Sequence, residues 1–297
     1  MILHIDGLYK SFGDKEVLKG FCMDVPEKSI FGFIGKNGAG KTTTMKLVLG
    51  LIKPDSGEIS VAGEKVIYGK TGTNRHIGYL PDVPEFYPFM TSREYLAFCG
   101  EITGMGKKNI EKRSDELLEL VGLRNEKHRI KGFSRGMKQR LGIAQALFNS
   151  PKLLICDEPT SALDPAGRKE ILDILMEVKE QTTVIFSTHI LSDVERICTD
   201  VSFIDGGKIC ISGKIDEIKE KYRSDEYLLE TETQEGIKAF GAAFPATHIN
   251  GHTLTFSEKD ISVFDIMRFS AENRIAVIKL DRIEPTLESL FLEVTGR

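Results

Sequence analysis

The loop Gly35–Thr42 has residue types and a spacing that could bind a phosphate group. It reads Gly-Lys-Asn-Gly-Ala-Gly-Lys-Thr, which fits the pattern G-x-x-x-x-G-K-[ST]. Glycines let backbone N–H groups point inward at a helix N-terminus, where the partial positive charge favours an anion. In such a loop Lys41 reaches the β- and γ-phosphates and the Thr42 hydroxyl binds Mg²⁺. The sequence therefore predicts a nucleotide-binding loop here, against the alternative of an ordinary glycine-rich turn.

A second group of chemically active residues follows an apolar run. Leu153–Cys156 is predicted to be a buried strand, and Asp157 and Glu158 come directly after it. Open α/β folds bind ligands at the carboxyl ends of their strands, so both carboxylates are expected at that edge. Asp157 is the expected Mg²⁺ ligand, and Glu158 the expected general base for an attacking water. Taken alone, an Asp-Glu pair after a core strand can equally be a surface feature.

A third segment, Phe133–Arg140, opens a helix that is predicted over about Gly136–Phe148. Ser134 stands where an N-cap residue would, and a helix N-terminus is a further place for an anion. From the residues alone, a capped helix start is the simpler interpretation, with Lys138 and Arg140 as solvated surface groups. A lone histidine such as His189 is likewise more often structural than catalytic.

The elements around these residues indicate an α/β fold with a helical insertion. The loop lies between the predicted strand Ser29–Ile34 and the predicted helix Thr42–Leu49, which is the context that a phosphate cradle needs. Further strands are predicted at Leu3–Ile5, Glu58–Val61, His76–Leu80 and Thr183–Phe186. Helices are predicted from a capping box at Thr91–Glu94 to about Ile102, and over Ile110–Val121.

Residues 225–297 are predicted to form a separate unit. The pattern gives strands Tyr227–Glu230, Ala246–Ile249, Thr253–Phe256 and Ile275–Leu280, and helices Gln234–Phe244, Ile261–Asn273 and Thr286–Val294. The order β-α-β-β-α-β is typical of the ferredoxin-like α+β arrangement. The polar stretch Lys219–Ser224 is the predicted linker.

The composition is that of a globular protein large enough for two domains. The chain has 297 residues, of which 41% are hydrophobic and 28% charged. Its net charge of −4 argues against a nucleic-acid partner. We expect neither a membrane span nor a signal peptide, because no apolar run reaches about 18 residues and the N-terminus lacks a basic, then apolar, stretch. Five scattered cysteines without a C-x-x-C pair fit reduced thiols in the cytoplasm.

Taken together, the motifs over about residues 1–215 resemble the ATP-binding subunit of an ATP-binding-cassette (ABC) transporter. Gly35–Thr42 matches the phosphate loop, and Phe133–Met137 lies where the family carries its Leu-Ser-Gly-Gly-Gln signature. Asp157 and Glu158 match the magnesium aspartate and the catalytic glutamate. Ser161–Asp164 matches the D-loop and His189 the switch histidine. All of these motifs occur in the family's order.

The resemblance implies a P-loop NTPase cassette with a mixed sheet at residues 1–218, its helical subdomain at about 85–150, and an accessory domain at 225–297. It implies Mg²⁺ bound by Thr42, Asp82 and Asp157, and catalysis by Glu158 and His189. The ATP-binding residues that it implies are Phe12, Gly35, Lys36, Asn37, Gly38, Ala39, Gly40, Lys41, Thr42, Thr43, Ser134 and Gly136.

Three positions depart from the family pattern or leave a choice. Arg135 and Met137 replace the usual Gly and Gln of the signature. Asp82 stands at the glutamine of the Q-loop, where a carboxylate can bind Mg²⁺ or water but cannot donate an amide hydrogen bond. The aromatic residue that stacks on adenine aligns best with Phe12, and Tyr9 is the alternative.

The function that the resemblance implies is ATP hydrolysis that drives a separate membrane permease, docked near Glu85–Thr103, from the inner face of the membrane. Two cassettes, identical or different, would then hold ATP between them. The segments Asp205–Ile209 and Glu284–Phe291 resemble a bacterial exporter subgroup. The alternatives are a P-loop kinase, which leaves Phe133–Met137 unexplained, and a non-transport ABC ATPase acting on nucleic acid or the ribosome. The transported substrate does not follow from this chain.

Overall fold

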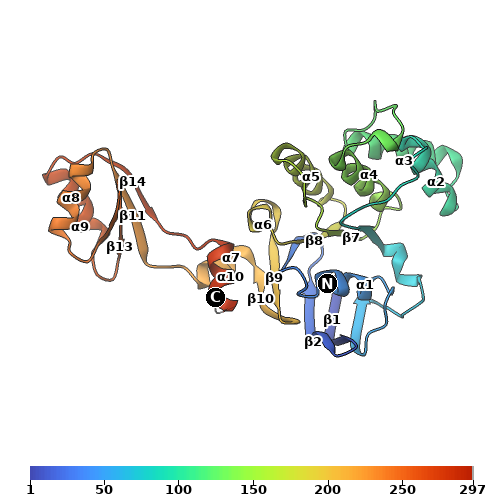
Figure 1. The fold of residues 1–297 in the computed structure, drawn as a ribbon, viewed down its shortest axis with the longest axis horizontal. Helices are drawn as coiled ribbons and strands as arrows, with labels where there is room; N and C mark the ends of the chain where they lie inside the picture. Colours follow the sequence, from blue (N-terminus) through green and yellow to red (C-terminus); the bar gives the residue numbers. More distant parts are fainter. Residues whose placement is uncertain (296–297) are drawn as a thin grey trace. The chain divides into compact units, whose positions relative to one another are not determined.

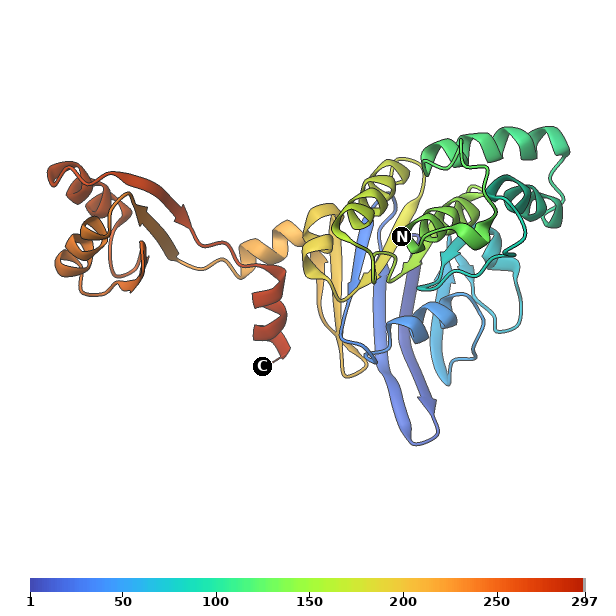
Figure 2. The ribbon, with the colours of Figure 1, turned by 45° about the horizontal axis from the view of Figure 1, so that its top comes forward.

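The computed structural model describes residues 1–295, and the chain divides into two units. The first unit holds Met1–Ile215 and the residues from Phe291 onward, and the second holds Asp216–Leu290. Figure 1 traces them in sequence colours, and Figure 2 gives a second view. Each unit buries a hydrophobic core of its own.

The central sheet of the first unit brings the predicted chemical groups to one edge. Its strand order is β10 (Lys208–Lys214), β9 (Asp200–Asp205), β3 (Ile30–Ile34), β8 (Thr183–Thr188), β7 (Leu153–Asp157) and β6 (Ile77–Leu80). Neighbouring strands are parallel, except that β10 runs antiparallel to β9. Every residue of β3, β7 and β8 is buried, as in parallel strands that are covered on both faces, and their polar residues lie at the strand ends. Because β3, β7 and β8 are parallel, the segments that follow them meet at the same edge.

A second, antiparallel sheet packs against the central sheet. Its strands lie in the order β2 (Lys15–Val25), β1 (Leu3–Phe12), β4 (Ser56–Val61) and β5 (Glu64–Lys65). The two sheets share a hydrophobic cluster in which Phe21 of β2 meets Phe33 of β3 edge to face, with 5.9 Å between ring centroids. The sequence prediction missed β2 and ended the first strand at Ile5. In the structure β1 continues to Phe12, which places this residue at the β1–β2 hairpin.

The helices of the first unit include the predicted insertion. They are α1 (Lys41–Val48), α2 (Ser92–Ile102), α3 (Lys107–Leu120), α4 (Arg135–Leu147), α5 (Pro165–Val178) and α6 (Leu191–Ile197), with 3₁₀ turns η1 (Gly72–His76) and η2 (Ile130–Gly132). Helices α2, α3 and α4 pack together (Figures 1 and 2). The predicted capping box begins α2, because the Glu94 N–H donates to Thr91 Oγ1 at 3.3 Å and the Thr91 N–H donates to Glu94 Oε2 at 2.8 Å. Helices α5 and α6 were not predicted.

The linker predicted at Lys219–Ser224 is wrong in its first half. Helix α7 (Ile215–Lys221) continues through those residues. Ile215 and Ile218 are buried one turn apart, which anchors one face of the helix. Among the helices of residues 1–295, none combines the length and the apolar character that crossing a bilayer requires.

The second unit is an α+β layer. It contains β11 (Glu226–Thr231), α8 (Gln234–Ala243), β12 (His248–Asn250), β13 (Thr253–Ser257), α9 (Val263–Glu272) and β14 (Val277–Arg282), and α10 (Leu287–Thr295) follows. The sheet order is β12-β13-β11-β14, and each neighbouring pair is antiparallel. Helices α8 and α9 lie on one side of this sheet (Figure 1), where Phe240, Phe256 and Ile266 are buried. Element boundaries differ from the predicted ones by at most two residues.

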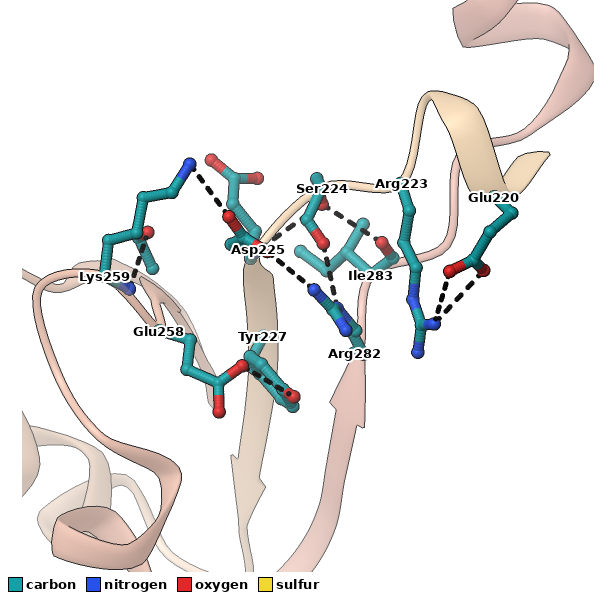
Figure 3. Close-up of polar contacts among 11 residues, drawn as sticks. Glu220, Arg223, Ser224, Asp225, Tyr227, Glu258, Lys259, Arg282 and Ile283 are labelled. Carbon is teal, nitrogen blue, oxygen red and sulfur yellow. Dashed lines mark hydrogen bonds and ion pairs between the residues drawn. The ribbon is translucent and has the colours of Figure 1, made fainter. Parts of the chain in front are cut away.

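The start of β11 and the end of β14 are tied together by a group of polar residues, Ser224, Asp225, Lys259 and Arg282, which we name the neck clasp (Figure 3). Arg282 donates from Nη2 to Asp225 Oδ1 at 2.6 Å and from Nε to the Ser224 carbonyl at 2.9 Å. Lys259 Nζ lies 2.8 Å from the other carboxylate oxygen of Asp225. The Ser224 hydroxyl donates to the Ile283 carbonyl at 3.1 Å. The clasp holds the two ends of the unit side by side.

Candidate functional site

The loop after β3 has the backbone shape that a phosphate cradle needs. A Cβ at Gly35 would lie 2.6 Å from Ile204 Cγ2, so only glycine lets the loop approach β9 this closely. Gly40 has φ 115°, a conformation that L side chains rarely adopt, and it precedes the first turn of α1. Both glycines therefore set the path by which the chain turns from strand into helix.

Lys41 is a buried cation at the start of α1. Its side chain is 6% exposed, and a charge in that environment needs polar partners. Its Nζ donates to the Gly35 carbonyl at 2.5 Å and lies 3.2 Å from Glu158 Oε1. These two contacts direct the ammonium group across the phosphate loop toward the end of β7.

Asp157, the last residue of β7, receives a hydrogen bond on each carboxylate oxygen. The Thr42 hydroxyl donates to Oδ2 at 2.8 Å, and the Ser187 hydroxyl donates to Oδ1 at 2.7 Å. The carboxylate is thus fixed between α1 and β8. Sequence reasoning missed Ser187, which lies one residue beyond the predicted strand Thr183–Phe186. In the register of β7 and β8, Ser187 lies opposite Asp157, and its hydroxyl is the feature that could have indicated this contact.

Glu158 turns sharply away from β7. Its φ of 50° is in the left-handed region, which costs a non-glycine residue on the order of 1–3 kcal/mol. Its backbone N–H donates to the Ser187 carbonyl at 3.1 Å, which holds this conformation. His189 Nδ1 lies 2.9 Å from Glu158 Oε2. The strained turn therefore aims one carboxylate at both Lys41 and His189.

Lys41, Asp157 and Glu158 face an open pocket of about 520 Å³. Its lining residues are Phe12, Lys15, Val17, Lys36, Asn37, Gly38, Gly40, Lys41, Thr42, Thr43, Asp82, Asp157 and Glu158. The pocket thus gathers most of the predicted ATP-binding residues, together with Lys15 and Val17, which the sequence analysis did not name. Of the two candidate aromatic residues, Phe12 lines the pocket, whereas the ring of Tyr9 covers Gly20 of β2.

The carboxylates at this edge of the sheet act on a neighbouring tyrosine. The pKa of Tyr79, on β6, is raised to about 12, first by burial and then by the nearby charges of Asp157 and Asp82. The phenol therefore stays neutral at physiological pH. A cation that entered here would be attracted by the same carboxylates.

Comparison with known proteins agrees with this geometry. A family model described as ABC transporter matches residues 18–161. The chain is 38% identical to the bacitracin transport ATP-binding protein BcrA of Bacillus licheniformis, over 99% of this chain and 97% of that protein. It is 34% identical to the linearmycin resistance ATP-binding protein LnrL of Bacillus subtilis, over 100% and 99% of the two chains. The chain belongs to the ABC transporter family.

Solved structures support the same assignment for the fold. CbiO1 from Clostridium perfringens, part of the ABC transporter complex cbiONQ, has a TM-score of 0.69 and 27% identity, over 82% of this chain and 96% of that one. Another ATP-binding subunit of an ABC transporter has a TM-score of 0.66 and 31% identity, over 75% and 93%. The expected ABC ATPase cassette with its mixed α/β sheet is confirmed, and the chain is an ATP-hydrolysing subunit of the bacterial exporter type.

In this ABC ATPase the signature segment is separate from the pocket lining. The Ser134 hydroxyl accepts a hydrogen bond from the Met137 N–H at 3.2 Å, which confirms the predicted N-cap of α4. A Cβ at Gly136 would meet its nearest atoms at 4.0 Å, so the first turn of α4 has an open face. Gly35, Ala39 and His189 also lie outside the lining, although His189 reaches Glu158.

The oxygen donors beside the ABC phosphate loop suit a hard divalent cation. Thr42 Oγ1 and Asp157 Oδ2 are 2.8 Å apart, which places a hydroxyl and a carboxylate oxygen together. Mg²⁺ is bound by one or two such protein oxygens, with water and substrate phosphates completing its shell. The residues present therefore fit Mg²⁺ bound together with ATP. Asp82 lines the same pocket, and its Oδ1 accepts a hydrogen bond from Arg135 at 3.2 Å.

Proposed function

We propose that this chain binds Mg²⁺–ATP in the pocket beside Gly35–Thr42 and hydrolyses it to power export through a separate permease. The observation that carries the proposal is the convergence of Lys41, Asp157 and Glu158, from two different elements, on one pocket. Bound Mg²⁺ would be held by Thr42 and Asp157 and would offset phosphate charge.

The roles of the residues follow from their contacts. Lys41 would bind the β- and γ-phosphates in place of its present contact with Glu158. Glu158, once released, would accept the proton of the attacking water as a general base. His189, 2.9 Å from Glu158, would orient that carboxylate and contact the γ-phosphate. Phe12, half exposed at the pocket, would stack on the adenine ring.

The relatives support an exporter whose membrane part is another chain. BcrA is named for bacitracin transport and LnrL for linearmycin resistance, and this chain spans 97% and 99% of them. We propose that it works at the inner face of the membrane and that the segment near Glu85–Thr103 contacts the permease. The second unit, Asp216–Leu290, contains the order β-α-β-β-α-β and would serve as a ferredoxin-like accessory domain, with bounds that are shifted toward the N-terminus from the predicted 225–297.

The separation of Ser134 and Gly136 from the pocket supports a dimer of cassettes. We propose that the open first turn of α4 in one chain covers the γ-phosphate held by the other, because a helix N-terminus attracts an anion. The partner would be a second copy of this chain or a related cassette. ATP then joins the two chains until hydrolysis removes the γ-phosphate.

The test is the mass of Glu158→Gln in solution, measured by light scattering during gel filtration with Mg²⁺–ATP. This variant should bind ATP without hydrolysing it, so a dimer is expected with ATP and a monomer without nucleotide. Lys41→Ala is the matched control and should remain monomeric, because its ATP binding is lost. A monomeric Glu158→Gln at saturating ATP and high protein concentration would contradict dimerisation of the isolated chain. Phosphorylation of an acceptor molecule, or co-purification with nucleic acid, would favour the kinase or the non-transport alternative.

A further inference from the structure

Two side chains of α4 hold one residue of the segment that follows β6. Arg135 Nη2 donates to Asp82 Oδ1 at 3.2 Å, and Gln139 Nε2 donates to the Asp82 carbonyl at 2.6 Å. Arg135 and Gln139 are four residues apart and therefore lie on the same face of the helix. We name these three residues the Asp82 clamp.

The clamp lies on a tightly packed contact. Gln139 is fully buried, and a Cβ at Gly142 would lie 2.5 Å from Leu80 Cδ1. The Gln139 Oε1 atom has no hydrogen-bond partner among the described residues. An unsatisfied buried oxygen destabilises a protein, so the amide is costly to keep there. The hydrogen bond from Gln139 Nε2 to the Asp82 carbonyl offsets that cost.

Asp82 connects two parts of the proposed site. Asp82 lines the nucleotide pocket with Lys41 and Asp157. The helix that holds it begins directly after Ser134, whose hydroxyl caps the first turn. Asp82 and Arg135 are also positions at which this chain departs from the family pattern, and they carry opposite charges in contact with each other. Asp82 thus connects the nucleotide pocket to α4 within the same chain.

We propose that Arg135 and Gln139 are positioning residues, which act through Asp82 to fix the start of α4 relative to the nucleotide pocket. The proposal rests on the proposed function in one respect, because the position of Ser134 affects turnover only if Ser134 contacts ATP in a dimer. The Arg135–Asp82 pair is partly exposed, so breaking it should change turnover by about two- to five-fold.

The experiment is a double-mutant cycle in the full chain with Asp82→Asn, Arg135→Met and both changes together. Hydrogen exchange of residues 82–90 and 134–140 is measured without nucleotide, and kcat and the ATP Kd are measured separately. Each single change should speed exchange in both segments. Arg135→Met should lower kcat about two- to five-fold at unchanged Kd, and should have little further effect in the Asp82→Asn background. Gln139→Leu keeps the buried volume and should speed exchange in 82–90 further.

Lys138→Met is the matched control, because it removes a cation from the same turn of α4 and leaves the clamp in place. Arg135→Lys keeps the charge and should recover part of kcat. Additive effects in the cycle, or unchanged exchange in 82–90 when Arg135 is replaced, would overturn the proposal. The exchange measurement needs no ATP, so a failure of the clamp is distinguishable from a failure of the proposed ATPase dimer.

Discussion

The nucleotide pocket and the neck clasp are both built from carboxylates and cations, but their charges face different surroundings. In the pocket, Lys41 and Glu158 are largely buried, with 6% and 13% of their side chains exposed, and they border an open cavity. In the clasp, Lys259 is 79% exposed and Asp225 and Arg282 are 34% and 25% exposed, and the charges contact one another (Figure 3). Similar residue types thus border a cavity in one place and join the ends of two strands in the other.

The difference bears on what each cluster does. Buried charges beside a cavity have lost solvation that a charged ligand can restore, so their arrangement serves binding and catalysis. Exposed pairs lose little solvation and gain little from pairing, so their effect is a modest stabilisation. Substitutions in the pocket should therefore change turnover and binding, and substitutions in the clasp should change the local stability of the second unit.

The largest effect is expected from Glu158→Gln in the pocket. The amide cannot accept the proton of the attacking water, so kcat should fall by about 10²–10⁴ while ATP still binds. Phosphate release reports kcat, and titration with a fluorescent nucleotide reports binding. The matched control is Glu258→Gln, the same chemical change beside the clasp, where Glu258 accepts a hydrogen bond from Tyr227. Equal loss of activity in the two variants would remove the distinction between the regions.

A smaller effect on binding is expected from Phe12→Ala. Aromatic stacking on a base contributes on the order of 1–3 kcal/mol, so the ATP Kd should rise by at least about five-fold. Tyr9→Ala is the control, because its ring covers Gly20 instead of lining the pocket. If Tyr9→Ala weakened binding and Phe12→Ala did not, the adenine would be assigned to the other aromatic residue.

Sequence reasoning placed the phosphate loop and the two carboxylates at one edge of the sheet, because they lie at or after the ends of strands that are buried on both faces. Such strands carry apolar runs, as at Ile30–Ile34 and Leu153–Cys156, and their ends are easy to recognise. The position of Ser134 at an N-cap was predicted for a similar reason, since capping depends on a few adjacent residues.

Strand β2 and the partners of Asp82 could not be predicted in the same way. The pairing of β1 with β2 shifts register three times, which interrupts the alternation that identifies a half-buried strand. Asp82 and Arg135 are 53 residues apart, and their contact depends on how α4 packs against Leu80. Such contacts arise from tertiary packing, which leaves no periodic signal in the chain.

The smallest effect is expected from Asp225→Asn in the clasp, and it should depend on pH. Hydrogen bonding and charge from Lys259, followed by those from Arg282, hold the pKa of Asp225 below its ordinary value of 3.8. The ionised carboxylate therefore stabilises the folded unit above about pH 3.8, and this contribution is lost as the pH falls through the lower folded pKa. Amide exchange of β11 and β14 in the full chain, corrected for intrinsic rates, should be faster in Asp225→Asn at pH 7, and the gap from wild type should close in acid. Asp281→Asn, which alters an exposed contact with Lys279 on the same strand, is the control and should show a smaller gap at pH 7. A gap that persists below the folded pKa would mean that the shape of the side chain, and not its charge, holds the two ends together.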